Sequence, residues 1–225
     1  MALRVVLGED SFLAREAICR VLEQAEGIEL VAACSDLNEL RETIDKTGPD
    51  VVLTDIRMAP DNSDEGIRLA TELRTRHPEI GVVVLSQHAE PLYASLLFEG
   101  GSDGRAYLLK ESVKDQGELS RALHTVAAGG SVVDPVVVEK LVEDRRRRED
   151  ARLDELTPRE LQILALIAQG QSNSAIADGL VITKRAVERH INSIFLKLDL
   201  RDADDISRRV KAALLYLAGE GARTG

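Results

Sequence analysis

The chain contains 225 residues, of which 44% are hydrophobic and 30% are charged. This length favours two small domains or one large one, and the composition excludes an intrinsically disordered protein. The sequence has no run of about 18 apolar residues that could span a membrane, and its apolar N-terminal stretch is too short for a secretory signal. We therefore expect a cytoplasmic protein without a membrane partner.

The net charge of −10 is distributed unevenly along the chain. Residues 1–130 contain 13 lysines and arginines against 23 aspartates and glutamates, whereas residues 131–225 contain 16 of each class. A strongly acidic protein is a poor partner for nucleic acid, but here that argument applies only to the first 130 residues.

Five short apolar segments in residues 1–130 predict buried β-strands. They cover residues 4–7, 28–33, 51–54, 82–86 and 106–109. Between them lie segments with the apolar spacing of helices, such as the stripe of Leu13, Ala17 and Val21. Strands that alternate with helices predict an α/β domain with a doubly wound, five-stranded parallel sheet of the flavodoxin-like kind.

Residues 131–152 are predicted to form a linker between two domains. The apolar stretch 136–142 is followed by four arginines, residues 145–148, inside a frame of glutamates and aspartates. A basic run can contact nucleic acid, but mixed charges of this kind are more typical of an exposed helix.

Residues 153–225 have an all-helical pattern. Thr157, Pro158 and Glu160 predict the start of a helix, with Thr157 as the N-cap and Glu160 completing a capping box. Further helices are predicted at residues 173–180, 184–198 and 204–217. Two helices joined by a turn of about three residues within a four-helix unit are typical of a helix-turn-helix domain.

Chemically active side chains follow the predicted strands at their carboxyl ends, where ligands bind in a doubly wound sheet. These residues are Glu9, Asp10, Asp55, Ser86 and Lys110. Carboxylates crowded at one edge repel one another unless a hard divalent cation such as Mg²⁺ neutralises them. If the lysine and the serine hold the oxygens of an incoming phosphoryl group, Asp55 is the candidate nucleophile.

Four stretches of the first 130 residues match a known pattern. They are Gly8-Glu9-Asp10, residues 51–58, Val84-Leu85-Ser86 and Tyr107-Leu108-Leu109-Lys110. These stretches resemble the receiver domain of bacterial two-component response regulators, so residues 1–130 are identified as a receiver. The resemblance implies that a sensor histidine kinase phosphorylates Asp55.

The same resemblance implies a role for each site residue. The implied Mg²⁺ ligands are Asp10, Asp55 and the main-chain carbonyl of Arg57, with Glu9 acting through water. The residues implied to contact the phosphoryl group or to move with it during activation are Ser86, Lys110 and Tyr107.

Two loops, residues 59–66 and 99–105, are longer than is usual in receivers. The first loop brings additional acids beside the site. One alternative is therefore an atypical receiver that is regulated without phosphorylation. A phosphotransfer enzyme with Asp55 as nucleophile is a second alternative. Such enzymes commonly need an acid two residues further along, where this chain has Arg57, so we expect the protein not to be an enzyme.

Residues 153–225 match a second known pattern in four stretches, 156–160, 170–173, 176–177 and 187–198. They resemble the LuxR-type helix-turn-helix of the NarL/FixJ response regulators. The resemblance implies a transcription factor that binds double-stranded promoter DNA and is controlled by phosphorylation.

The predicted helix 184–198 carries the candidate DNA contacts, which are Lys184, Arg185, Glu188, Arg189 and Asn192. With Lys197, residues 181–197 have a local charge of +3, which favours binding to phosphates by release of counterions. By analogy with the family, Glu188, Arg189 and Asn192 read base edges, whereas Lys184 and Arg185 hold phosphates. Glu188 either accepts from a cytosine amino group or pairs with Lys184 at i, i+4.

The last predicted helix has an apolar stripe that is broad enough for both a core and a partner. Its outer candidates are Ile206, Val210 and Leu214. The resemblance implies that this helix forms a homodimer on DNA, which would read two half-sites about one helical turn apart.

Overall fold

The computed structural model describes residues 2–111, 113, 116–200 and 205–223. The chain forms two compact units, Met1–Val142 and Glu143–Gly225, and each is described by itself. Among the described residues, no helix combines the length and the apolar composition needed to cross a bilayer.

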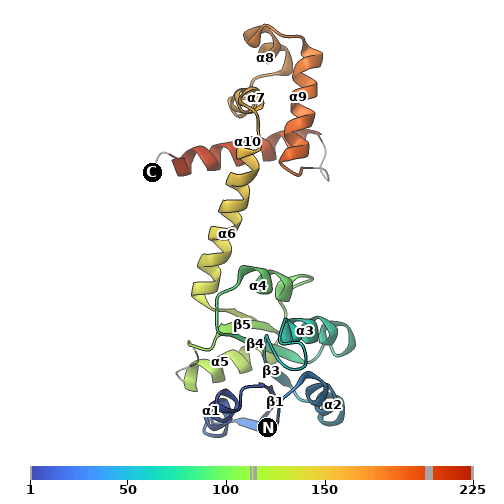
Figure 1. Ribbon diagram of the computed structural model, residues 1–225, viewed down its shortest axis with the longest axis vertical. Helices are drawn as coiled ribbons and strands as arrows, with labels where there is room; N and C mark the ends of the chain where they lie inside the picture. Colours follow the sequence, from blue (N-terminus) through green and yellow to red (C-terminus); the bar gives the residue numbers. More distant parts are fainter. Residues whose placement is uncertain (1, 112, 114–115, 201–204, 224–225) are drawn as a thin grey trace. The chain divides into compact units, whose positions relative to one another are not determined.

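The first unit is built on one parallel sheet (Figure 1). Its strands are β1 (Leu3–Gly8), β2 (Ile28–Cys34), β3 (Val51–Asp55), β4 (Gly81–Ser86), β5 (Arg105–Leu109) and β6 (Ser131–Val133). They lie in the order β2-β1-β3-β4-β5-β6. The five predicted strands are confirmed, and the doubly wound order places β1, β3, β4 and β5 side by side.

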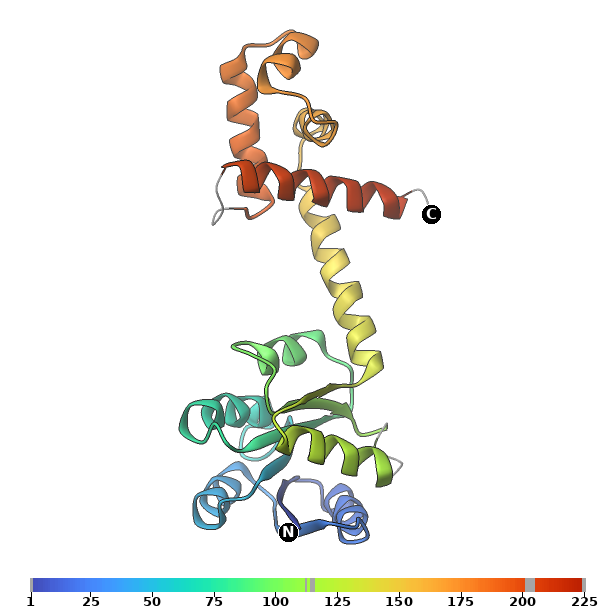
Figure 2. The same ribbon diagram turned by 180° about the vertical axis from the view of Figure 1, so that it is seen from behind.

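Helices cover both faces of this sheet because successive side chains of a strand point to opposite faces. The helices are α1 (Phe12–Glu23), α2 (Leu37–Thr47), α3 (Glu65–Arg76), α4 (Pro91–Phe98) and α5 (Gln116–Ala127). One core contains Val5, Leu7 and the apolar residues of α1 and α5, which lie side by side in Figure 2. The other core contains Val6, Val52 and the apolar residues of α2, α3 and α4.

The sheet has a sixth strand that the sequence pattern does not predict. β6 pairs with β5 through Ser131, Val132 and Val133, and Val137 just beyond it is fully buried in the core beside α2, α3 and α4. Residues 131–142, which the sequence analysis assigns to the linker, therefore belong to the first unit. An apolar run of three residues is too short to predict a strand from the sequence. β6 is recognised only by its pairing with the open edge of β5.

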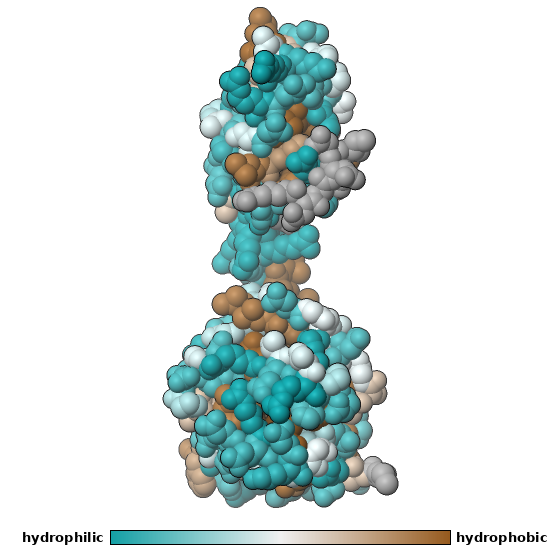
Figure 3. Space-filling model, turned by 90° about the vertical axis from the view of Figure 1, so that its right-hand side faces the viewer, coloured by the Kyte–Doolittle hydropathy of each residue, from teal (hydrophilic) through white to brown (hydrophobic). Residues whose placement is uncertain are grey.

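The second unit consists of helices around one core. After α6 (Pro135–Asp154), which begins in the first unit, come α7 (Pro158–Ala168), α8 (Asn173–Leu180), α9 (Lys184–Lys197) and α10 (Asp205–Arg223). Leu153, Ile163, Ile176, Ile191 and Ala212 belong to the core that these helices share. The predicted helix-turn-helix layout is confirmed. In Figure 3 the visible surface of each unit is mostly hydrophilic, as expected when the apolar residues are packed inside.

The buried carboxylate of Glu160 connects the start of α7 to α9. Glu160 completes the predicted capping box by accepting from the Thr157 main-chain N–H at 2.8 Å. It also accepts from Ser193 Oγ at 2.6 Å and Lys197 Nζ at 2.7 Å, both on α9. Burial alone would raise the pKa of Glu160, but the hydrogen bonds from Lys197, Ser193 and Thr157 outweigh it and lower the pKa to about 2.

We expect the second unit to lose stability in acid through Glu160. Because the folded-state pKa lies below the ordinary value of 4.5, the contribution of this carboxylate is complete above that pH and is lost as the pH falls towards 2. Glu160→Gln leaves the Lys197 ammonium without its buried partner and is expected to destabilise the unit by roughly 3 kcal/mol. Hydrogen–deuterium exchange of the α7 and α9 amides in the full chain measures the loss.

The matched control is Glu155→Gln, which neutralises an exposed side chain in the same unit. It is expected to leave the exchange rates and their pH dependence unchanged. Equal exchange in Glu160→Gln and wild type at neutral pH would contradict the proposed role of the buried carboxylate.

Candidate functional site

Three carboxylates meet at the carboxyl edge of the sheet. Glu9 and Asp10 follow β1 and Asp55 ends β3, and one ligand oxygen from each lies within 4.8 Å of the other two. Because β1 and β3 are neighbouring parallel strands, their ends bring these distant residues together. The prediction that Glu9, Asp10 and Asp55 form one acidic cluster therefore agrees with the geometry.

Lys110 connects the cluster to a third strand. Its Nζ donates to Glu9 Oε2 and to Asp55 Oδ2, at 2.7 Å in each case. The side chains of Lys110, Glu9 and Asp55 are 17%, 0% and 13% exposed, so this ion triad is largely shielded from water. The Lys110 ammonium thus links the carboxyl ends of β5, β1 and β3.

Burial and hydrogen bonding act in opposite directions on the pKa values of Glu9 and Lys110. Burial raises the pKa of Glu9, and the nearby Asp55 charge adds to the rise, although the hydrogen bond from Lys110 opposes it. Burial alone would lower the pKa of Lys110, but the hydrogen bonds to Asp55 and Glu9 outweigh it and raise the pKa. Lys110 therefore remains charged, while the acidic cluster favours additional positive charge.

Asp55 is held by its own main-chain surroundings. Its Oδ1 accepts from the Ile56 N–H at 2.7 Å. At the start of α3, Gly66 donates its N–H to the Ile56 carbonyl at 2.8 Å. A Cβ at Gly66 would lie 2.0 Å from the Asp55 main-chain oxygen, so only glycine allows α3 to approach the end of β3 this closely.

A cavity of about 180 Å³ opens beside the carboxylates. It is lined by Asp10, Asp55, Ile56, Arg57, Asn62, Ser86, Gln87, His88 and Glu90. The sequence predictions include Asp10, Asp55, Arg57 and Ser86. Asn62, Gln87, His88 and Glu90 were missed, because they lie in loops and no spacing pattern connects them to the strand ends.

The main-chain carbonyl of His88 joins the two predicted switch residues. It accepts from Ser86 Oγ at 2.7 Å and from the Tyr107 hydroxyl at 3.3 Å. Tyr107 is fully buried, and burial raises the pKa of its hydroxyl. Ser86 therefore lies at the cavity, whereas Tyr107 reaches the same loop from inside the core.

The acids of the long loop 59–66 do not join the acidic cluster. Asp61 and Asp64 pair with Arg68, at 3.5 Å and 2.8 Å. Glu65 is fully buried and accepts from the main-chain N–H groups of Ser63 and Met58 at 2.8 Å and 3.2 Å. These contacts fold the loop onto α3, so the loop contributes Asn62 rather than a carboxylate to the cavity.

The carboxylates fit a hard cation. Oxygen ligands at this spacing, two of them from partly exposed residues beside a cavity, suit Mg²⁺ better than a metal that prefers nitrogen or sulfur. No other group of at least three acidic, histidine or cysteine ligands is present among the described residues.

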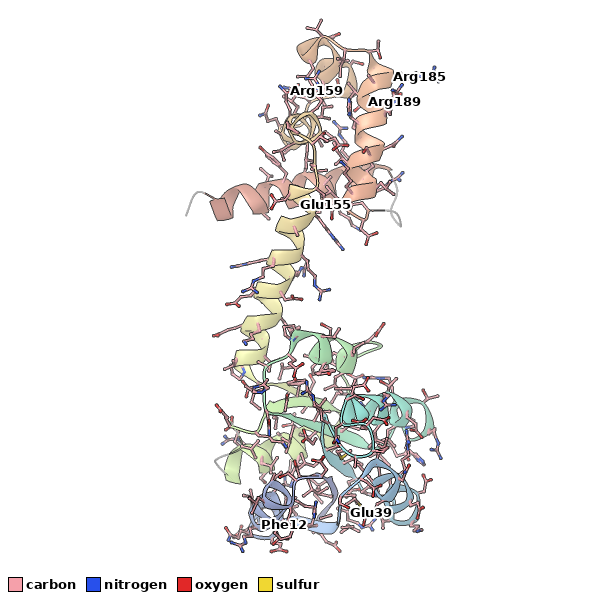
Figure 4. All side chains as sticks on the ribbon, viewed as in Figure 1. Phe12, Glu39, Glu155, Arg159, Arg185 and Arg189 are labelled. Carbon is pink, nitrogen blue, oxygen red and sulfur yellow. The ribbon has the colours of Figure 1, made fainter. Side chains whose placement is uncertain are left out.

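The predicted DNA contacts lie on one exposed side of α9. Those residues are Lys184, Arg185, Glu188, Arg189 and Asn192, and all of them are exposed. Figure 4 shows Arg185 and Arg189 on the side of α9 that faces away from α7. Val187, Ile191 and Ile194 are buried on the opposite side. Lys197 instead pairs with Glu160, so it does not add to the positive charge of the exposed face.

The predicted dimer residues belong to α10. Val210 and Leu214 are exposed at 54% and 61%, and Leu217 continues the stripe at 54%. Ala212 is fully buried on the other side of the helix. The side chain of Ile206 lies outside the described residues.

Comparison with known proteins supports both units. Residues 5–123 match the family described as response regulator receiver domain. Residues 154–210 match the family described as bacterial regulatory proteins, luxR family. A solved structure of the two-component response regulator RcsB in complex with DNA has a TM-score of 0.55 at 23% identity. The match covers 97% of this chain and 99% of that one, and it supports the fold alone.

Two curated relatives match nearly the full length. The chain is 32% identical over 217 residues to the transcriptional regulatory protein DegU of Brevibacillus brevis, with 89% of each chain covered. It is 32% identical over 199 residues to the probable transcriptional regulatory protein NarL of Mycobacterium tuberculosis, with 88% of this chain and 89% of that one covered. The chain therefore belongs to the NarL/FixJ family of response regulators, the DNA-binding transcriptional regulators in which a receiver precedes a LuxR-type helix-turn-helix.

Proposed function

We propose that phosphorylation of Asp55 by a sensor histidine kinase controls promoter binding by the second unit. The observation that carries this proposal is the ion triad of Lys110, Glu9 and Asp55 beside an open cavity. A carboxylate that is fixed by Lys110 and by the Ile56 N–H is positioned as a nucleophile. The partner kinase would present a phosphohistidine to the cavity.

In the proposed transfer, the Asp55 carboxylate attacks phosphorus, an O–P bond forms and the P–N bond to the kinase histidine breaks. Lys110 and the Ser86 hydroxyl are proposed to donate to the phosphoryl oxygens, which carry the charge that develops. To do so, Ser86 must exchange its contact with the His88 carbonyl for the phosphoryl group.

Asp10, Asp55 and the Arg57 main-chain carbonyl are proposed to hold Mg²⁺, with Glu9 assisting through water. Bound there, the ion would neutralise the carboxylates and the oxygens of the phosphoryl group. The spacing of the carboxylates supports this assignment, because one oxygen each of Glu9, Asp10 and Asp55 lies within 4.8 Å of the other two.

The second unit is proposed to place α9 in the major groove of promoter DNA. Arg189, Asn192 and Glu188 would read base edges, and Lys184 and Arg185 would hold phosphates. Among the described residues there is no ion pair between Lys184 and Glu188, which favours a base contact for Glu188 over an internal one. RcsB, whose fold this chain shares, has been solved in complex with DNA.

A homodimer is proposed to form through α10. Val210, Leu214 and Leu217 recur at helical spacing and leave an apolar stripe in water, which a second copy would cover. Since the proposed partners are a kinase and promoter DNA, the proposed location is the cytoplasm.

The two alternative functions find little support in the site. An atypical receiver was suggested by the acids of the loop 59–66, but Arg68 and main-chain N–H groups occupy those acids. A phosphotransfer enzyme would need a general acid near Asp55, and the side chain two residues further along is the guanidinium of Arg57. We therefore propose that Asp55 receives a phosphoryl group as a regulatory modification.

Phosphoryl uptake tests the role of Asp55. With acetyl phosphate and Mg²⁺, the full chain is expected to gain about 80 Da, the mass of one phosphoryl group, by intact-mass spectrometry. Asp55→Asn is expected to gain nothing, because an amide cannot act as the nucleophile. Chelation of Mg²⁺ is expected to reduce uptake in wild type to the level of Asp55→Asn.

The matched control for uptake is Asp61→Asn, which removes an exposed carboxylate from the loop next to the cavity. It is expected to take up the phosphoryl group as wild type does. Uptake by Asp55→Asn equal to that of wild type would rule out Asp55 as the acceptor.

Selection of bound duplexes from random DNA tests the contacts of α9. Arg189→Ala is expected to cost roughly 1–3 kcal/mol and to relax the selected sequence at one position of each half-site. Lys184→Ala is expected to weaken binding to all sequences alike and to reduce the slope of log affinity against log salt by about 1.

The control for DNA binding is Lys46→Ala, which removes an exposed lysine from the first unit. It is expected to leave affinity and sequence choice unchanged. If Arg189→Ala selects the same sequences as wild type with the same affinity, this side chain does not read bases.

A further inference from the structure

The segment Gln87–Glu90 lies between the cavity and α4, and side chains from three elements hold it. Ser86 and Tyr107 both donate to the His88 carbonyl, at 2.7 Å and 3.3 Å. The third contact is an ion pair, in which Arg57 donates to Glu90 Oε1 at 3.2 Å. The resemblance to receivers implies a switch role for Ser86 and Tyr107 but none for the side chain of Arg57.

Glu90 occupies a sensitive position, because it is the N-cap residue of α4. Its side chain makes no capping hydrogen bond to the helix, since its carboxylate is turned to Arg57. Arg57 in turn lies two residues after Asp55 and lines the same cavity. One guanidinium therefore stands between the phosphoryl-acceptor site and the first turn of α4.

This ion pair is suited to exchange partners. The Arg57 and Glu90 side chains are 53% and 35% exposed, and an ion pair that is open to water contributes little stability. A phosphoryl group carries nearly two negative charges against the single charge of a glutamate, and its oxygens match the donors of a guanidinium. A phosphoryl group on Asp55 would thus compete effectively for Arg57.

We propose that Arg57 is a third switch residue of the receiver. In the unphosphorylated state it pairs with Glu90, and on phosphorylation of Asp55 it transfers to the phosphoryl oxygens. The released Glu90 carboxylate then lies at the N-terminus of α4, where negative charge is favoured. This inference rests on the proposed phosphorylation of Asp55 and adds the route by which the new charge reaches α4.

The proposal predicts that the two partners of one ion pair have opposite effects on a phosphoryl analogue. The probe is beryllofluoride, formed from beryllium and fluoride in the presence of Mg²⁺ and titrated into the full chain by isothermal titration calorimetry. Glu90→Gln is expected to tighten its binding about two- to fivefold, because Arg57 then loses its charged competing partner and keeps only its contact with the neutral Tyr93 side chain. Arg57→Met is expected to weaken binding at least as much, because it removes a donor to the analogue.

The double variant Arg57→Met/Glu90→Gln separates this exchange from simple charge repulsion. Without Arg57, removal of Glu90 is expected to have no further effect, so the double variant should bind beryllofluoride like Arg57→Met. If Glu90→Gln tightens binding equally in the Arg57→Met background, repulsion explains its effect and the exchange is wrong. If both single variants weaken binding, the ion pair is merely structural and the proposal is also wrong.

Hydrogen–deuterium exchange of residues 87–98 supplies the conformational measurement. Beryllofluoride is expected to change the exchange of this segment in wild type, and unliganded Glu90→Gln is expected to show part of that change. The matched control is Glu42→Gln, which breaks the exposed Lys46 ion pair of α2 and should match wild type in both measurements. An unliganded Glu90→Gln segment identical to wild type would overturn the proposal. Failure of wild type to bind beryllofluoride would instead count against the proposed phosphorylation of Asp55.

Discussion

The ammonium group of Lys110 lies 2.7 Å from carboxylate oxygens of both Glu9 and Asp55, and the receiver site depends on this ion triad. The two carboxylates repel each other in a largely buried place, so the strand ends could not carry them without a cation between them. Lys110 supplies one positive charge for two negative charges, before Asp10 is counted. The shortage of positive charge explains why this edge of the sheet suits Mg²⁺, and it fixes Asp55 beside the cavity where a phosphoryl group would arrive.

The need for charge balance also helps to explain how the acidic residues are distributed along the chain. The net charge of −10 argues against a nucleic-acid partner only while the chain is treated as one body. The excess of acids lies in the first 130 residues, and part of it forms the proposed cation and phosphoryl site. In the second unit the partly exposed Lys197 pairs with the buried Glu160, and Arg185 and Arg189 remain on the exposed side of α9. The net negative charge thus belongs to residues 1–130, whereas residues 131–225 are neutral overall.

Much of this structure was predictable because it depends on local patterns. Buried apolar runs predicted β1 to β5, and Thr157 and Glu160 predicted the start of α7. Strand ends predicted that Glu9, Asp55 and Lys110 would meet. These features follow from sequence spacing and from the rule that parallel strands share a carboxyl edge.

The features that were not predictable depend on tertiary contacts. β6 exists because β5 has an open edge, and Glu65 is buried because the main-chain N–H groups of its own loop turn towards it. Glu90 and His88 line the cavity only because β4 ends beside β3. A main-chain carbonyl leaves no signal in a sequence, so the contact that joins Ser86 and Tyr107 could be found only in the structure.

In the proposed function, the charge on Asp55 governs DNA binding by the second unit. The most direct measurement is the affinity of the full chain for a duplex selected from random DNA, before and after phosphorylation by acetyl phosphate with Mg²⁺. Phosphorylation is expected to raise the affinity of wild type and to leave that of Asp55→Asn unchanged. Equal affinities of phosphorylated and unphosphorylated wild type would contradict it.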